Sequence, residues 1–429
     1  MILANGKLYD TKEQAFLLEH LEEEINTVRA SKRLAPETVV DALAELGRRV
    51  AEGAFDGLIA GLELDGGKEL AQEAARLLSR ESILYKLESE LGAGFFQEKR
   101  TSPPVGRPVA IRPEPLGTLF HIAAGNADGL PAFSAAEGLL TGNVNILKLP
   151  QADNGVSIAV LQELVRIAPE LSGFLYVFDT PSSDLAAMKR MAEVSDGIVV
   201  WGSGEAVTAV RRLAPAGVKL IEWGEKLGFA YIAGYEDKET ELRALAGHII
   251  RTKQLLCSSC QTIFLDTENM DEVREFCAEF LPYLEAAAKE APQMSRNAAA
   301  EITLRRYCGM LEQAMAGKTN EKRDVFQGRM CRLTACPDHG LELSGMFGDC
   351  LVKPLPRNLL FSALRSRKGV LQTAGLICRE EERGFFTDLL TRAGLIRVTR
   401  AGNMSEPFPG EGHDGEYPLR RYVRIVAVE

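Results

Sequence analysis

Short apolar runs alternate with helical segments between residues 117 and 223, and this alternation limits the possible folds more than any other feature. The runs GTLFHIAA, VNILKLP, FLYVFDT, DGIVVWGS and VKLIEWGE have the length and composition of buried strands. The segments between them predict a helix ending near Leu140, one capped by Asp153 that ends near Pro169, one over residues 184–193 and one over 206–213. Strands joined in series by helices pair in parallel. The sequence therefore predicts an α/β fold with a doubly wound parallel sheet.

The flanking regions differ in pattern and suggest four parts in a chain of 429 residues. Residues 1–103 are predicted to be mainly helical and to pack on the doubly wound domain, which covers residues 104–238. A second α/β domain is expected over residues 239–395, where QLLCSSCQTIFL forms a strand and an amphipathic helix follows. A C-terminal segment over residues 396–429 is expected to return to the core and to end in the strand YVRIVAV.

Charge and composition exclude several classes of function. The net charge of −10 and the pI near 5.3 argue against a broad nucleic-acid or anionic-membrane surface, because such surfaces are basic. No stretch approaches the roughly 18 apolar residues of a membrane-spanning helix, and MILANGKLYDTKEQ does not have the pattern of a leader. Eight scattered cysteines are too few for a disulfide framework. We expect a cytoplasmic protein with reduced thiols.

Polar and glycine-containing turns follow the predicted strands of the first domain. No G-x-G-x-x-G turn follows the first strand, so an ordinary dinucleotide-binding fingerprint is not present. The turns that do occur are Gly125–Asn126, Lys148–Gln151, Gly202–Glu205 and Glu222–Lys226. Because parallel strands bring their carboxyl ends to one edge, where such sheets bind ligands, these turns predict a ligand site there.

These pieces, taken in order, resemble the aldehyde dehydrogenase superfamily. That superfamily shows an Asn just past a strand, then G-N-x-x-x-x-K, G-S-x-E, E-L-G-G-K and Q-x-C segments. The matching pieces here are Asn126, GNVNILK (142–148), GSGE (202–205), EWGEK (222–226) and QLLC (254–257). Any one of these motifs alone would be weak evidence for the family, but all five occur in the same order as in the superfamily.

Within that superfamily the chain is most similar to the acyl-CoA reductase family of bacterial luminescence. The likeness depends on CSSCQ after QLL, on LQTAGL (371–376) and on HDGEYPLRRYVR (413–424). The chain departs from ordinary aldehyde dehydrogenases because it lacks an E-x-F-G-P segment downstream of the cysteine. The resemblance implies an aldehyde-dehydrogenase-like fold, with residues 104–238 binding a nicotinamide dinucleotide and residues 239–395 carrying the catalytic cysteine. It also implies NADPH-dependent reduction of a fatty acyl thioester to the aldehyde.

Three catalytic roles are implied by the resemblance, and the chemistry of the side chains suits each. Cys257 would be the nucleophile, because a thiolate attacks a thioester well and can leave again after reduction. Asn126, together with a backbone N–H at Cys257, would hold the developing oxyanion. Glu222 would be the general base.

The resemblance also assigns cofactor-binding residues. Lys148 would contact the adenosine ribose, and a helix N-terminus would face the pyrophosphate. The turn residues assigned to the cofactor are Gly202, Ser203, Gly204, Glu205 and Gly224. NAD-preferring relatives usually carry a Glu three residues after the lysine, and here that residue is the neutral Gln151, so NADPH is the expected cofactor.

Two other functions remain open at this stage. The same cysteine and glutamate would support oxidation of an aldehyde to the acid if water reached the acyl-enzyme. Alternatively, Cys257 and Cys260 form a C-x-x-C pair, which would suit a thiol-redox or binding protein without a nicotinamide cofactor. We interpret Cys260 as a small packing residue, which argues against the thiol-redox function.

The remaining motifs are interpreted as structural. Cys331, Cys336 and His339 lack a fourth nearby ligand for tetrahedral zinc, so no metal site is expected. The sequence His413-Asp414-Gly is typical of a turn. The expected partners are acyl-CoA or an acyl-carrier protein as substrate and, by resemblance, an acyl-protein synthetase and further copies of the chain in a homo-oligomer.

Overall fold

The computed structural model describes residues 1–61, 67–94, 97–123, 129–151, 153–291 and 323–429. Asn126 lies outside these residues. The chain divides into two compact units, one formed by Met1–Gly224 with Phe408–Glu429 and the other by Glu225–Pro407. The division after Gly224 differs from the predicted boundary after residue 238, because strand β10 (Leu227–Ile232) pairs within the second sheet. The C-terminal segment likewise joins the first unit at Phe408 and not at residue 396.

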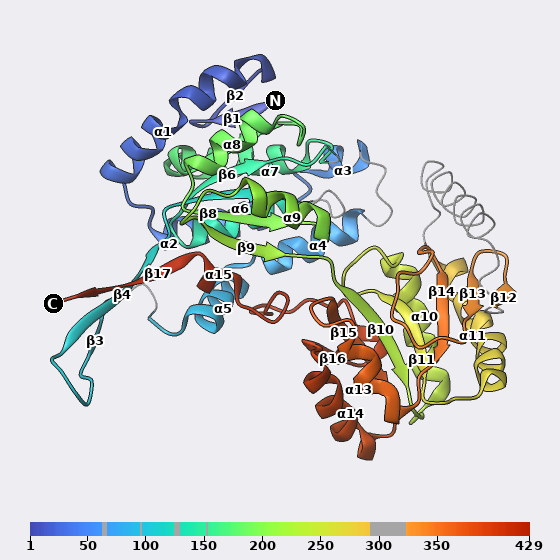
Figure 1. Cartoon of the computed structure of the whole chain (residues 1–429). Helices are drawn as coiled ribbons and strands as arrows, with labels where there is room; N and C mark the ends of the chain where they lie inside the picture. The colour runs from blue at the N-terminus through green and yellow to red at the C-terminus, as the bar shows by residue number, and fades with distance from the viewer. Residues whose placement is uncertain (62–66, 95–96, 124–128, 152, 292–322) are drawn as a thin grey trace. The chain divides into compact units, whose positions relative to one another are not determined.

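The first unit contains two sheets and the helices that cover them (Figure 1). Its strands are β1 (Ile2–Ala4), β2 (Lys7–Tyr9), β3 (Lys99–Thr101), β4 (Val109–Pro115), β5 (Thr118–Ile122), β6 (Val144–Lys148), β7 (Leu175–Phe178), β8 (Gly197–Trp201), β9 (Lys219–Trp223) and β17 (Val423–Val428). Its helices are η1 (Thr11–Glu13), α1 (Gln14–Ser31), α2 (Pro36–Ala51), α3 (Asp56–Gly61), α4 (Gly67–Leu77), α5 (Arg80–Leu91), α6 (Leu130–Leu140), α7 (Val156–Ile167), η2 (Pro169–Phe174), α8 (Leu185–Glu193), α9 (Gly204–Leu213) and α15 (Pro418–Arg421).

The larger sheet of this unit has the order β2-β1-β7-β6-β5-β8-β9, and its strands from β7 to β9 are parallel. Strand β5 lies in the centre, and the chain winds outward from it in both directions, first through β6 and β7 and then through β8 and β9. Every residue of β5, β6, β7 and β8 is buried, as expected for strands covered by helices on both faces. The predicted doubly wound parallel sheet is confirmed.

Two short strands at the N-terminus were not predicted. Strand β1 pairs antiparallel with both β2 and β7, so the first residues of the chain extend the sheet at one edge. Ile2 and Leu3 are fully buried in its core. Three-residue strands carry too little periodicity to be recognised against a mainly helical region. At the other end of the chain, β17 pairs with β4 in a three-stranded antiparallel sheet.

The second unit is built around its own sheet, in the order β12-β13-β14-β11-β10-β15-β16. Its strands are β10 (Leu227–Ile232), β11 (Cys260–Leu265), β12 (Asp324–Gln327), β13 (Arg332–Ala335), β14 (Asp349–Pro354), β15 (Leu371–Ile377) and β16 (Arg397–Thr399). Its helices are α10 (Lys238–Thr252), α11 (Met270–Glu290), α13 (Arg357–Arg365), α14 (Glu380–Ala393) and η3 (Ala401–Asn403). All pairs except β12–β13 are parallel, so this unit is also doubly wound, here around β10.

A buried histidine links the central strands of the first unit. His121 on β5 is fully buried; its Nε2 lies 3.0 Å from Asn145 Oδ1 and its Nδ1 lies 2.8 Å from Ser134 Oγ. Since the amide oxygen only accepts, Nε2 carries the proton and Nδ1 accepts from the Ser134 hydroxyl. Trp201 Nε1 donates to the same hydroxyl oxygen at 3.0 Å. Burial lowers the pKa of His121 to about 4, so the neutral ring is the folded form.

We predict that the first unit loses stability as the pH falls from about 6.5 to about 4. In that range the unfolded histidine binds a proton and the folded one does not, so His121 costs up to about 3 kcal/mol of stability at the acidic end. The measurement is urea unfolding followed by the fluorescence of Trp201 and Trp223, the only two tryptophans. His121→Gln should flatten the pH dependence, and an unchanged slope would contradict the assignment.

Candidate functional site

The turn after β8 leads into the N-terminus of helix α9 in the first unit. Ser203 caps α9, and its side chain accepts from Ala206 N at 3.3 Å. The first backbone N–H groups of a helix have no partner within the helix and carry partial positive charge. Gly202 and Gly204 flank the cap, and a Cβ at Gly204 would meet nothing within 4 Å. A phosphate group can therefore approach the backbone closely at this turn.

Aromatic rings support this turn and the neighbouring strand end. Trp201 ends β8 and Trp223 ends β9, with ring centroids 5.6 Å apart. The His413 ring packs against both, at 4.6 Å and 5.0 Å. Gly202 N also donates to Trp223 O at 3.1 Å, which holds the Gly202 turn beside the segment that leads to Gly224. Two sequence-predicted segments are thus brought together.

Lys148 ends strand β6 and Gln151 follows it, at the same carboxyl edge of the sheet. Lys148 is nearly fully buried, and its Nζ donates to Ser182 Oγ at 2.8 Å. Burial lowers the pKa of Lys148, and the nearby Asp179 partly offsets this effect. Gln151 is exposed in the turn after the strand.

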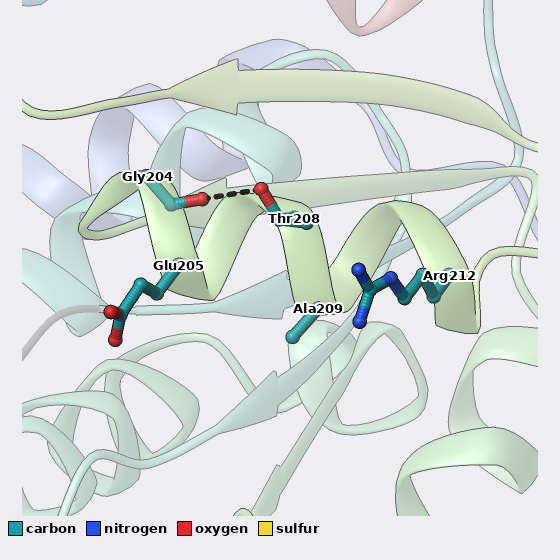
Figure 2. A pocket seen from close by; sticks show the side chains of 5 residues that line it. All are labelled: Gly204, Glu205, Thr208, Ala209 and Arg212. Carbon is teal, nitrogen blue, oxygen red and sulfur yellow. Dashed lines mark hydrogen bonds between the residues drawn. The ribbon is translucent and has the colours of Figure 1, made fainter.

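An open hollow of about 360 Å³ lies along the exposed face of α9, immediately after the glycine turn. It is lined by Gly204, Glu205, Thr208, Ala209 and Arg212. Figure 2 shows Glu205 and Arg212 at opposite ends of this row, with Ala209 between them. Thr208 Oγ1 donates to Gly204 O at 2.7 Å, so its hydroxyl proton is turned toward the helix backbone. The volume falls in the range of small-molecule sites.

Glu222 on β9 is held by an arginine in this structure. Arg211 donates to both of its carboxylate oxygens, at 2.5 Å and 2.6 Å. These hydrogen bonds from Arg211 lower the pKa of Glu222. A carboxylate in a bidentate pair is a weak base, so Glu222 must separate from Arg211 before it can accept a proton. Arg211 carries no recognisable sequence signal for this role, because its pairing with Glu222 joins helix α9 to strand β9.

Cys257 belongs to the second unit and lies in the connection between α10 and β11. Seven cysteines are described; Cys257 is half-buried, and the other six are buried. The connection is compact, since Leu256 N donates to Ser259 Oγ at 3.1 Å and Ser259 N to Leu256 O at 2.9 Å. Because β11 starts at Cys260, Cys257 lies at the amino-terminal edge of the second sheet.

Cys260 differs from Cys257 in burial. It is fully buried as the first residue of β11, and its backbone N donates to His248 Nε2 at 3.3 Å. Burial raises the pKa of its thiol to about 12, so the thiolate is scarce at neutral pH. These features agree with the interpretation of Cys260 as a packing residue and argue against a redox role for the C-x-x-C pair.

A glycine on the adjacent strand lets the cysteine segment pack closely. Gly228 on β10 lies in register with Cys260. A Cβ on Gly228 would lie 2.6 Å from Ser259 O and 2.8 Å from Ser258 O, which no real side chain tolerates. Glycine is therefore needed at this position for the backbone after Cys257 to take its observed path.

The other motifs take structural positions. Cys331 and Cys336 are buried, and His339 Nδ1 lies 2.7 Å from the carbonyl oxygen of Pro354. Within the described residues no group of three or more His, Cys, Asp or Glu side chains is arranged to hold a metal ion. Asp414 and Gly415 have positive φ and Glu416 N donates to His413 O, so the predicted turn is present. No described helix has the length and apolarity to span a membrane.

Comparison with known protein families identifies the family of this chain. The profile of the family described as acyl-CoA reductase (LuxC) matches residues 37–425. The chain belongs to this acyl-CoA reductase family. The resemblance found in the sequence is therefore confirmed.

Curated relatives in this family are distant in sequence. The chain is 24% identical over 331 residues to a long-chain acyl-protein thioester reductase of Photobacterium leiognathi, and 22% identical over 332 residues to one of Aliivibrio fischeri. Each match covers 74% of this chain and 65% of the relative, so the chain spans about two thirds of the length of these relatives.

Solved structures confirm the aldehyde-dehydrogenase-like fold of this chain. A methylmalonate-semialdehyde dehydrogenase from Oceanimonas doudoroffii superimposes with a TM-score of 0.72 at 15% identity. The match covers 100% of this chain and 97% of that structure. At this identity the likeness establishes the fold alone.

Proposed function

We propose that this chain, a member of the acyl-CoA reductase family, converts a fatty acyl thioester to the aldehyde through a covalent intermediate on Cys257. The observation that carries the proposal is the burial pattern of the cysteines. Cys257 is half-buried on a short connection, while the other cysteines that the structure describes are buried. A thiol must be reachable to attack a thioester, and Cys257 meets this requirement. The names of the curated relatives, which are long-chain acyl-protein thioester reductases, support the same reaction class.

The first unit fits a nicotinamide dinucleotide. The N-terminus of α9 offers backbone N–H groups for a pyrophosphate, and the hollow of about 360 Å³ beside it can accept a flat base against Thr208 and Ala209. Lys148, buried and oriented by Ser182, is proposed to contact the adenosine ribose. Gly224, also assigned to the cofactor, directly follows Trp223, whose carbonyl oxygen accepts a hydrogen bond from Gly202 N. The reduced cofactor would supply a hydride when bound.

In the proposed reaction, bonds form and break in a fixed order at the sulfur of Cys257. Its sulfur attacks the thioester carbon, the bond from that carbon to the donor sulfur breaks, and the donor thiol leaves with a proton. A hydride from the bound reduced cofactor would add to the same carbon of the acyl-cysteine and give the anion of a thiohemiacetal. Collapse of this species breaks the bond to Cys257 and releases the aldehyde. We propose that Asn126 and the backbone N–H of Cys257 stabilise the oxyanion of these steps.

Glu222 is proposed to take the proton of the Cys257 thiol once Arg211 has released it. In the paired state its lowered pKa keeps it ionised but weakly basic. Arg211 therefore sets how readily the base becomes available. We further propose that the acyl donor is acyl-CoA or an acyl group on a protein thiol, that an acyl-protein synthetase supplies the latter, and that the chain acts as a homo-oligomer.

The nucleophile is tested by two cysteine variants. Cys257→Ala should abolish turnover and covalent acyl loading, because no other described thiol is accessible. Cys260→Ala should keep most of both, since the Cys260 thiol is buried and its pKa is about 12. Incubation with acyl-CoA followed by intact-protein mass spectrometry measures the loading. An active Cys257→Ala variant and an inactive Cys260→Ala variant would show that the wrong cysteine was assigned.

Aldehyde oxidation is distinguished from acyl reduction by its products. The proposal expects aldehyde and free thiol from acyl-CoA with NADPH, with little acid formed from aldehyde and NADP. Chromatography of both reactions gives the ratio. Efficient formation of acid with no reduction of the thioester would establish the oxidative function instead.

Cofactor preference is tested at Gln151. We expect the protein to use NADPH over NADH, and Gln151→Glu should lower kcat/KM for NADPH about tenfold or more while changing that for NADH little. A carboxylate near the 2′-phosphate would add repulsion of roughly 1 to 4 kcal/mol at about 4 Å, depending on the effective dielectric constant. Gln97→Glu, at an exposed position before β3, makes the same charge change away from the strand ends. Equal effects at both positions, or a native preference for NADH, would contradict the assignment.

The base is tested by a matched pair of substitutions. Glu222→Gln should slow acyl loading from acyl-CoA by about two to four powers of ten, the usual range for a positioned base. Arg211→Gln should raise the pKa of Glu222 toward its ordinary value, because it removes the guanidinium that stabilises the carboxylate. The acidic limb of the pH profile for loading should then move to higher pH. Single-turnover mass spectrometry measures both. Normal loading in Glu222→Gln would mean that Glu222 is only a strand-end carboxylate.

A further inference from the structure

Strained backbone is concentrated in two loops of the second unit that meet each other. Lys253 and Gln254, with φ of 50° and 60°, lie on the loop that leads to Cys257. Met346 and Phe347, with φ of 60° and 51°, lie on the loop before β14. Phe347 N donates to Lys253 O at 3.0 Å, which joins the two loops. Left-handed φ values are unfavourable for these residue types and persist only where surrounding contacts enforce them.

The side-chain amide of Gln254 supplies these contacts. Gln254 is fully buried, and its Nε2 donates to Cys260 O and to Ser344 Oγ, both at 2.9 Å. Its Oε1 accepts from Gly348 N at 3.0 Å. One amide therefore joins the start of β11 to both ends of the second loop. The amide nitrogen donates hydrogen bonds while the amide oxygen accepts one, and this combination fixes the orientation of the side chain.

The backbone of Gln254 and its polar neighbours complete the same network. Gln261 Nε2 donates to Gln254 O at 2.7 Å, and Ser344 Oγ donates to Gln261 Oε1 at 2.8 Å. Met346 N donates to Ser344 Oγ at 3.0 Å. The two ends of the segment from residue 254 to residue 260, which contains Cys257, are therefore tied together, because the Gln254 amide donates to Cys260 O and the Gln254 carbonyl accepts from the Gln261 side chain. Buried and fully used polar networks of this kind make a local structure rigid.

We propose that Gln254 is a positioning residue for Cys257, acting through the backbone of the loop and not through contact with substrate. The inference rests on the proposed role of Cys257 as the nucleophile. The loop also presents Leu255 and Leu256, which are 38% and 41% exposed, beside the nucleophile. Holding this loop fixes the direction from which the thiol meets an acyl carbon. Small displacements of a reacting group lower the rate strongly, by about a hundredfold for 1 Å.

The test uses Gln254→Met, which keeps the volume of the side chain and removes its hydrogen bonds. The matched control is Tyr231→Phe, which removes one buried hydrogen bond, from Tyr231 Oη to Leu355 O at 3.1 Å, in the same sheet. The readouts are the melting temperature, the single-turnover rate of acyl loading on Cys257 by peptide mapping, kcat and KM for the thioester, and NADPH binding by tryptophan fluorescence.

Gln254→Met should load acyl groups about ten- to a hundredfold more slowly, with kcat falling more than KM rises and with NADPH binding unchanged. Tyr231→Phe should load at the native rate. Equal loading in the two variants would overturn the proposal. If Gln254→Met does not fold, Ser344→Ala, which removes one of the same hydrogen bonds, decides the question: slower loading supports the proposal and native loading overturns it.

The two proposals can fail separately. If Cys257→Ala still forms the acyl-enzyme, the nucleophile is wrong, whatever Gln254 does. If Cys257→Ala is inactive while Gln254→Met loads at the native rate, the nucleophile stands and the positioning role is wrong.

Discussion

Parallel pairing of short buried strands determines where chemistry can occur in this protein. Strands β5, β6 and β8 are buried along their whole length, so the interior of the sheet leaves little room for exposed polar groups. Polar function is therefore confined to the strand ends. In the first unit Lys148 ends β6, Gly202 follows β8 and Glu222 is the last residue but one of β9, so all three lie toward the carboxyl edge of the sheet. Pairing in parallel is enough to bring them to one edge from distant parts of the sequence.

In the second unit the candidate residue lies at the opposite edge of the sheet. Cys257 lies before β11, at the amino-terminal edge, although open α/β sheets usually bind ligands at the carboxyl edge. No strand end or helix N-terminus presents this cysteine, because it follows the C-terminus of α10. The connection reverses direction with left-handed residues at Lys253 and Gln254, and hydrogen bonds from a buried amide hold it. The left-handed backbone of this connection thus persists because the hydrogen bonds of the buried amide hold it.

The sequence alone predicted what depends on local pattern. Apolar runs located β5 to β9 closely, and helical periodicity located α8 and α9, because burial on both faces leaves a clear signal in the residues themselves. Contacts between distant segments were not predictable in this way. The pairing of Arg211 with Glu222 depends on which face of α9 lies toward β9, and the contact of Gln254 with Ser344 joins loops ninety positions apart. The boundary after Gly224 was also missed, because an apolar strand does not show which of two sheets it joins.

The family motifs in this chain contain both candidate functional residues and residues that stabilise the fold, and the structure distinguishes them. In the segment GNVNILK, Lys148 reaches the strand end, but Asn143 is fully buried at the start of the same strand. Its Oδ1 accepts from Gly117 N at 2.8 Å and its Nδ2 donates to Tyr422 O at 3.0 Å. Asn143 therefore ties the beginning of β5 to the C-terminal segment, and a substitution there would act on folding and not on catalysis. An unpaired amide at this depth is costly, so the motif is needed for assembly of the first unit as well as for its chemistry.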